Sequence, residues 1–239
     1  MKLWAAAHSL IKQSDYFREL LTGEFSESIV RSSAKSKADA KMDAEQRHRD
    51  FEDSDDETDA TTTGGFREVK HKQTASRPHK IVLVKDAAYT TYFAILVWMG
   101  SRWIRFAPLR SISTPSQTIR DMIETSPQVP APASPKSVYR LAHLLDLRDL
   151  QDLALANIAS QLTEENAATE LFSDVASAYP EVRDVVLAYV LEHWREVLAS
   201  KGWKTIKELC DAQVLPIGGM YTAILLTEKL SSLGGLGHA

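Results

Sequence analysis

The large apolar side chains of this 239-residue chain are gathered in three blocks, separated by two stretches that contain few of them. The first of these stretches runs from residue 31 to residue 78. Its only large apolar residues are Met42, Phe51, Phe66 and Val69. Ser, Ala, Lys and Asp fill much of the rest, including an acidic run at 50–59. Such a segment cannot bury enough apolar surface to offset the entropy of ordering it. We therefore expect residues 31–78 to form a disordered acidic insertion.

The second polar stretch, residues 113–135, contains five prolines. Proline cannot donate a backbone hydrogen bond and disfavours helical geometry in the residue before it. This composition predicts a linker, with one helical turn around Ile119–Ile123.

The first apolar block covers residues 1–30. Leu3–Ala7 is predicted to form a strand. Ser14 has the residue type preferred at a helix N-cap, and Gly23 is a suitable stop for the helix between them. One face of that helix is apolar at helical spacing, through Tyr16, Phe17, Leu20 and Leu21.

The second block covers residues 79–112. His79–Val84 reads HKIVLV, which predicts a short buried strand. Asp86 is then the predicted cap of a helix. The residues expected to face inward from that helix are Tyr89, Phe93, Leu96 and Val97.

The third block, residues 136–213, is predicted to be entirely helical and is followed by a tail at 214–239. Helices are expected over Ser137–Leu145 and Asp149–Leu162, since apolar residues recur there at helical spacing. Thr163 is the expected cap of the next helix, and Pro180 the expected first residue of another. Gly202 is expected to separate the last helix from the one before it.

The order of these elements is strand–helix, insertion, strand–helix and helical array. Too few strands remain for an all-β fold or a doubly wound sheet. The predicted class is therefore α+β and predominantly α-helical.

Composition narrows the range of partners and locations. The chain is 44% apolar and 25% charged with a formal charge of -4, which gives no general attraction to nucleic acid or to anionic membranes. A single cysteine excludes an intrachain disulfide and a cysteine-based zinc cage. No apolar run approaches the length of about 20 residues that a membrane span needs. We expect a protein of the cytoplasm or the nucleus that contacts neither nucleic acid nor membrane.

The sequence contains no recognisable catalytic motif. Nucleophile-elbow, P-loop and dinucleotide-binding patterns are all absent. The seven histidines include no pair four residues apart with carboxylates suited to a helical metal site. Cys210, beside Leu209 on an apolar helix face, is expected to be a small core residue. We predict a protein that is not an enzyme and needs no cofactor.

Three stretches of the chain resemble the broad-complex/POZ (BTB) family of interaction domains. The first is Ser14-Asp15-Tyr16-Phe17-Arg18 followed by GEFSES at 23–28, and the second is Ile81-Val82-Leu83 with the helix 89–98. The third, LTEENAATEL at 162–171 with YVLEHWREVLASKGWKTI at 189–206, is similar to the 3-box helices of speckle-type POZ proteins. The β-hairpin that normally opens such a domain is missing. The resemblance therefore implies an incomplete BTB core followed by a helical array.

The resemblance implies a dimerising adaptor that joins substrate proteins, here unidentified, to a cullin-type ubiquitin ligase. In such adaptors a hydrophobic-x-acidic triplet contacts the cullin, which assigns that contact to Phe25 and Glu27. An aromatic residue that merely closes onto the core is the alternative for Phe25. The likeness to the 3-box adds three candidates for the cullin contact: Asn166, Leu171 and Val175. The first stretch supplies candidates for a dimer interface or for the core: Leu10, Tyr16, Phe17 and Leu20.

Two other interpretations remain open. The chain could be an oligomerisation or scaffold module without a ligase role, in transcriptional or structural assemblies, or a truncated and non-functional relative. The single cysteine excludes the zinc fingers of BTB transcription factors, and no substrate-recognition domain is apparent. Ser54, followed by Asp55-Asp56-Glu57, is a candidate site for an acidophilic kinase.

Overall fold

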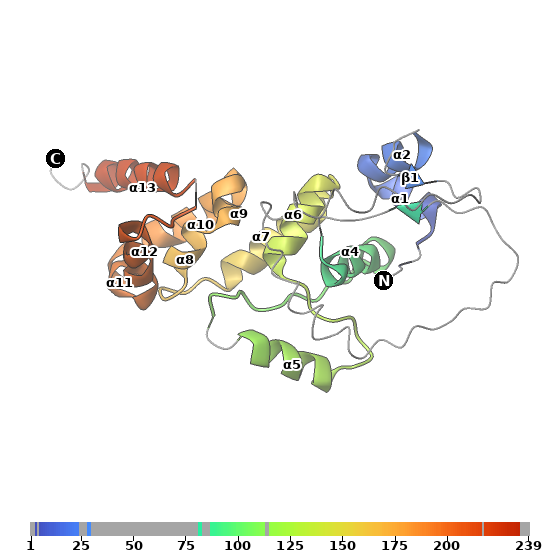
Figure 1. The fold of residues 1–239 in the computed structure, drawn as a ribbon, viewed down its shortest axis with the longest axis horizontal. Helices are drawn as coiled ribbons and strands as arrows, with labels where there is room; N and C mark the ends of the chain where they lie inside the picture. Colours follow the sequence, from blue (N-terminus) through green and yellow to red (C-terminus); the bar gives the residue numbers. More distant parts are fainter. Residues whose placement is uncertain are drawn as a thin grey trace, which may run out of the picture.

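A computed structural model describes residues 3, 5–23, 28–29, 81–82, 87–112, 115–216 and 218–234. Over these ranges the chain is predominantly helical and has almost no strand, which confirms the helix-rich class. The predicted acidic insertion, 31–78, lies outside the described residues. Figure 1 shows the helices following one another along the long axis of the molecule, from α1 and α2 at one end to α13 at the other.

The chain begins with two short helices, α1 (Ala7–Gln13) and α2 (Asp15–Thr22), which share Ser14 as their common boundary residue. The Ser14 hydroxyl accepts a hydrogen bond from the Phe17 N–H at 3.3 Å, and the backbone N–H of Gly23 closes α2 on Glu19. The predicted N-cap and helix stop are therefore confirmed.

The strand predicted at Leu3–Ala7 is wrong. Ala7 already belongs to α1, and Leu3, Ala5 and Ala6 belong to no strand. Alanine has the highest helix propensity of all residues, and a short apolar run does not by itself distinguish a strand from a helix.

Two short strands form the only sheet among the described residues. β1 (Ser28–Ile29) pairs antiparallel with β2 (Ile81–Val82), with Ser28 opposite Val82 and Ile29 opposite Ile81. β2 occupies the middle of the strand predicted at His79–Val84. The pairing brings together the chain on either side of residues 30–80.

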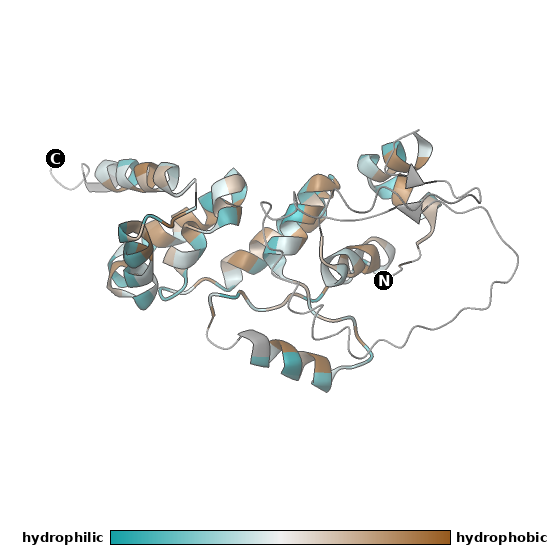
Figure 2. Cartoon of the chain, viewed as in Figure 1, coloured by the Kyte–Doolittle hydropathy of each residue, from teal (hydrophilic) through white to brown (hydrophobic). Residues whose placement is uncertain are grey.

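Helix α4 (Tyr89–Ser101) turns a different face to the core from the one that the sequence predicts. Tyr89, Phe93, Leu96 and Val97 are only partly buried. The buried residues of the helix are instead Thr90, Thr91, Ala94, Ile95, Trp98 and Met99. The segment is apolar on all sides, so helical spacing alone does not identify its inner face. Figure 2 shows apolar residues on α4 and on the helices α6 and α7 nearby.

The predicted linker contains a helix of three turns, α5 (Pro115–Thr125), where a single turn is expected. The segments before and after α5 pair through Ala107 and Arg105, whose backbone groups bond to those of Ala133 at 2.9 and 3.0 Å. One side-chain bond to α5 comes from the Arg105 guanidinium, which donates to the Met122 carbonyl at 2.9 Å. Figure 1 shows α5 projecting away from the other helices.

The centre of the molecule is the helix pair α6 (Pro135–Leu144) and α7 (Arg148–Ser160). Ser134 caps α6, and its hydroxyl accepts from the Ser137 N–H at 3.4 Å. Asp146, in the turn between the two helices, has a left-handed φ of 52°. Side chains from both helices, including Val138, Ala142, Leu150 and Ile158, are completely buried.

The C-terminal helices form an array that packs against α6 and α7. They are α8 (Ala167–Leu171), α9 (Asp174–Ala178), α10 (Pro180–Glu192), α11 (Trp194–Ala199), α12 (Lys201–Asp211) and α13 (Gly219–Gly234). Pro180 is the first residue of α10, as predicted. Gly202 does not separate helices: it lies inside α12. Most of the predicted tail is helix α13, which contacts α10.

Candidate functional site

Three of the predicted functional residues, Phe25, Glu27 and Ser54, lie outside the described residues. Phe25 and Glu27 fall between the end of α2 and the start of β1. The cullin contact and the phosphorylation site assigned to them stay predictions.

The other cullin-contact candidates are core residues, which corrects the role predicted for them. Leu171 is completely buried, Asn166 is 2% exposed and Val175 is 8% exposed. Leu171 and Val175 are apolar, and they belong to the same core cluster as the residues of α7 and α10. Their burial explains the apolar spacing of this segment, so a partner that binds here would contact exposed neighbours instead.

Asn166 uses its side chain to organise the turn before α8. Its Oδ1 accepts from the Thr163 N–H at 2.8 Å, and its Nδ2 donates to the Gln161 carbonyl at 3.0 Å. In return, the Thr163 hydroxyl accepts from the Asn166 N–H at 3.3 Å. Buried amides are retained where they are hydrogen-bonded in this way. Thr163 was expected to cap this helix alone; in the structure, Thr163 and Asn166 share the capping through these reciprocal hydrogen bonds.

The dimer-or-core candidates of the first block contribute to the core within one chain. Phe17 and Leu20 are 2% and 4% exposed, and Leu10 and Tyr16 are partly buried against the same cluster. The α1–α2 pair is also tied to the centre by polar contacts. The Ser14 hydroxyl donates to the Leu145 carbonyl at 2.7 Å.

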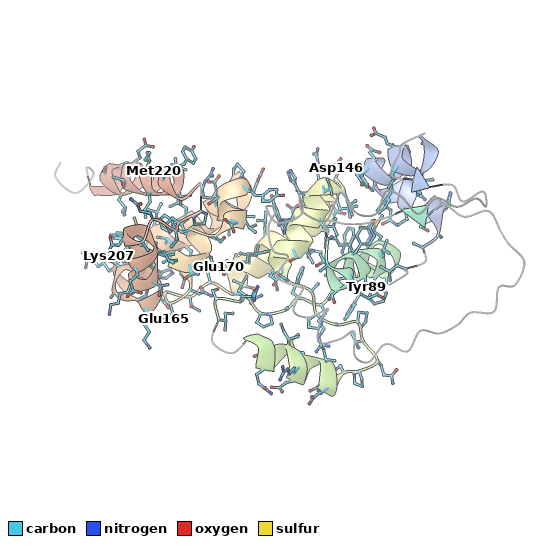
Figure 3. The ribbon with its side chains drawn as sticks, in the orientation of Figure 1. Tyr89, Asp146, Glu165, Glu170, Lys207 and Met220 are labelled. Carbon is cyan, nitrogen blue, oxygen red and sulfur yellow. The ribbon has the colours of Figure 1, made fainter. Side chains whose placement is uncertain are left out.

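A buried carboxylate that sequence reasoning missed joins three segments of the chain. Glu170 is 2% exposed and lies in α8. It forms an ion pair with Lys136 of α6 at 3.0 Å and accepts from the Ser111 hydroxyl at 2.5 Å. Sequence alone carries no signal for this site, because its partners are 34 and 59 residues away. Figure 3 labels Glu170 at the junction of the central helices and the C-terminal array.

Gln161 fixes the loop before α5 to the end of α7. Its Oε1 accepts from the Leu109 N–H at 2.8 Å, while its Nε2 donates to the Ala107 carbonyl at 3.2 Å and to Asn157 Oδ1 at 2.7 Å. One side chain thus satisfies backbone groups of a segment that forms no regular sheet.

Tyr139 is 1% exposed, and its hydroxyl donates to Glu181 Oε2 at 3.3 Å. Burial, together with the neighbouring Glu181 carboxylate, raises the pKa of Tyr139 to about 12. Burial also raises the pKa of Tyr92 and of Tyr189. These tyrosines are neutral structural groups at neutral pH.

The C-terminal helices, and the segment between α12 and α13 that contains Val214, carry several large apolar side chains that are exposed. They are Leu198 at 46%, Leu209 at 37%, Val214 at 61%, Met220 at 74%, Tyr221 at 54% and Ile224 at 49%. A shallow hollow of about 550 Å³ lies on α13 and is lined by Ala223, Ile224, Thr227, Glu228 and Ser231. Exposed apolar side chains that gather in one region are characteristic of protein–protein contact surfaces. Figure 3 shows Met220 on α13, at the opposite end of the molecule from the first helices.

Cys210, predicted to lie in the core, is exposed. Only Gly202 and Ile206 of α12 are buried, which leaves Cys210 and its neighbour Leu209 on the outer side of the helix. Within the described ranges, no three His, Cys, Asp or Glu side chains are placed to hold a metal ion. None of the described helices combines the length and the apolar character that crossing a bilayer requires.

Comparisons with protein-family models, with curated proteins and with solved structures gave no significant match. The BTB/POZ relationship therefore stays a prediction from the sequence.

Proposed function

We propose that this protein is a BTB/POZ-type interaction protein, a dimerising adaptor that links substrate proteins to a cullin-type ubiquitin ligase. The observation that carries the proposal is the packing of the three family-like stretches. Phe17 from the first, Ile95 from the second and Leu171 from the third belong to one core cluster, although they are far apart in sequence. Segments that resemble parts of one domain are expected to pack as one domain.

Polar contacts support the same grouping. Gln13 Nε2, just before the first stretch, donates to the Met99 carbonyl at the end of α4 at 2.8 Å. Ser14, the first residue of that stretch, donates to the Leu145 carbonyl between α6 and α7. The α1–α2 pair is therefore held to the centre of the molecule by directed bonds as well as by its apolar face.

The partner surface of the 3-box-like region is assigned to its exposed residues, since its predicted contacts are buried. Leu198 of α11 and Leu209 of α12 lie in or just after the stretch 189–206 and are 46% and 37% exposed. An apolar side chain that is exposed in the monomer gains free energy when a partner covers it, at about 25 cal/mol per Å² of apolar surface.

One observation favours the alternative of an oligomerisation or scaffold module without a ligase role. Burial of Asn166, Leu171 and Val175 removes three of the five residues assigned to the cullin contact. The partly buried apolar face of α4, with Tyr89 and Phe93 stacked at 6.0 Å, is a surface on which another chain could pack.

Binding of a purified cullin N-terminal domain to variants of this protein tests the proposal. We expect Phe25→Ala, Glu27→Lys and Leu198→Asp each to weaken capture at least tenfold. Leu153→Asp is the matched control, because Leu153 of α7 is 45% exposed, almost the same as Leu198. Equal capture by Leu198→Asp and Leu153→Asp would contradict the surface assignment. Failure of the folded wild-type protein to capture any cullin would favour the scaffold alternative.

A further inference from the structure

Helix α13 is held to the rest of the described chain by few contacts. Leu226 is the one large apolar residue of the helix that is buried among its described side chains, whereas Met220 and Ile224 are 74% and 49% exposed. The side-chain hydrogen bonds of α13 stay within the helix or reach Gly218, directly before it. Among the described residues no ion pair joins α13 to another helix. Figure 1 shows α13 at the C-terminal end of the molecule.

Two buried polar atoms without partners lie in residues that α13, or the residue directly before it, contacts. Three side-chain nitrogen or oxygen atoms of the described residues are sealed from solvent and have no hydrogen-bond partner. One of them, Gln13 Oε1, belongs to α1. The other two are Ser177 Oγ of α9 and Arg183 Nε of α10. Buried polar groups are hydrogen-bonded in most folded proteins, so two exceptions beside one helix need a physical account.

The Ser177 hydroxyl is covered at the start of α13. Gly218 packs directly against it: a Cβ at Gly218 would lie 2.9 Å from Ser177 Oγ and 2.5 Å from Ser177 Cβ. No water or side chain fits between the two residues at that separation. A hydroxyl that is sealed in this way loses the hydrogen bonds that it makes in water and gains none in exchange. Packing of the start of α13 on α9 is therefore opposed by the desolvation of Ser177.

The Arg183 guanidinium is covered by the first turn of α13. The residue is 8% exposed, and the Tyr221 ring centroid lies 5.0 Å from its guanidinium carbon. None of the ion pairs between described residues includes Arg183. Arginine stays protonated in proteins, so it cannot avoid the cost of desolvation by losing its proton. Contact with an aromatic face offsets only part of that cost. Docking of α13 on α10 is therefore opposed at a second point.

We propose that α13 is a releasable cover, which undocks from α9 and α10 in a local opening while the rest of the described chain stays folded. Segments with few buried apolar contacts open at a lower free energy than the core of the same protein. Burial of Leu226 favours the docked helix, and the unpaired atoms of Ser177 and Arg183 oppose it. Opening returns both groups to water and uncovers the sides of α9 and α10 on which α13 lies. This device does not rest on the proposed adaptor role.

Native-state hydrogen exchange of the full chain, read by mass spectrometry and corrected for intrinsic rates, tests the proposal. We expect the amides of 223–232 in α13 to exchange at least about a hundredfold faster than those of 184–192 in α10. Ser177→Ala and Arg183→Met each remove an unpaired atom, so each is expected to slow exchange of α13 at least about threefold. Leu226→Ala is expected to speed it about tenfold or more. Arg195→Met is the control, because Arg195 is an exposed arginine of α11.

Two results would overturn the releasable cover. The amides of α13 could exchange as slowly as those of α10, which would mean that α13 opens only when the whole protein unfolds. Alternatively, Ser177→Ala could exchange no more slowly than the wild type, which would mean that the sealed hydroxyl does not oppose docking. Faster exchange in a folded Arg183→Met would remove the arginine from the account. Circular dichroism of each variant establishes that it is folded, and Ser177→Ala gives an independent reading if Arg183→Met unfolds.

Discussion

At the scale of single residues, Glu170 is a buried polar group that ties three segments of the chain together. It joins α8 to α6 through Lys136 and to the loop before α5 through Ser111. The Glu170 side chain is 2% exposed and the Lys136 side chain that pairs with it is 16% exposed, so neither the carboxylate nor the ammonium group is well solvated by water. Such a pair contributes little net stability over an apolar replacement, but removing one partner leaves the other uncompensated.

We predict that Glu170→Gln lowers the free energy of unfolding by about 3 kcal/mol, because it leaves Lys136 buried without a counter-charge. Urea unfolding measures the loss. Asp149→Asn is the control, since Asp149 pairs with Arg102 at 3.8 Å while its side chain is 82% exposed. That change is expected to cost at most about 1 kcal/mol. Equal losses in the two variants would contradict a structural role for the buried pair.

Tyr139 makes the stability of the folded protein depend on pH in the alkaline range. Its pKa is about 12 in the folded chain against 10.0 for an ordinary tyrosine. Between these values the unfolded chain releases the proton and the folded chain keeps it, so stability is full below pH 10 and falls as pH rises towards 12. We predict a smaller loss of stability between pH 9 and pH 11 in Tyr139→Phe, measured by urea unfolding. An unchanged loss would show that Tyr139 titrates normally.

Local chemistry made some single residues predictable. Ser14 and Gly23 are found where their cap preferences place them, because a cap depends on residues within one turn. The roles of Asn166 and Cys210 were not predictable in this way. Asn166 is buried by its contacts with the turn at 161–163, and Cys210 is exposed because α12 buries its opposite side.

At the scale of the element, Gly202 shows how close packing of two helices selects a residue. It lies in α12, where an added Cβ would lie 2.2 Å from the Glu165 carbonyl oxygen. That oxygen belongs to the backbone and cannot turn away. The absence of a side chain therefore lets α12 approach the segment before α8, where the Glu165 carboxylate also accepts from the Lys201 N–H at 3.0 Å.

Two glycine substitutions test this packing. We predict that Gly202→Ala lowers the free energy of unfolding by about 3 kcal/mol, because helix and backbone must separate. Gly100→Ala is expected to raise it by about 0.5–1 kcal/mol, since Gly100 lies in α4 with nothing within 4 Å of the added Cβ and alanine favours helix. Thermal or urea unfolding measures both. A neutral Gly202→Ala would mean that α12 does not approach Glu165 this closely.

The buried face of a helix was predictable only where polar residues occupy its other sides. In α6 and its C-cap residue Leu145, apolar residues recur at helical spacing between polar ones, and these apolar residues, Val138, Leu141, Ala142 and Leu145, are buried. In α4 the segment YTTYFAILVWMGS offers apolar residues on every side. Its inner face is chosen by contacts with α1 and α6, so tertiary packing decides what the pattern leaves undetermined.

At the scale of the whole molecule, the three family-like stretches form one core and the C-terminal helices extend it. The helical class and the order of the blocks could be predicted, because they follow from composition and periodicity. The partner surface could not. Asn166, Leu171 and Val175, assigned to it by resemblance, are buried, and the set of exposed apolar residues between α11 and α13 depends on which sides of those helices pack inward.

The most direct test of the adaptor proposal is the mass in solution of this protein mixed with a cullin N-terminal domain, measured by size-exclusion chromatography with light scattering. Alone, the protein is predicted to elute at twice its chain mass of 26.6 kDa. The mixture is predicted to elute as one species with two copies of each partner. A folded protein with the mass of one chain, eluting apart from the cullin, would contradict the dimerising adaptor.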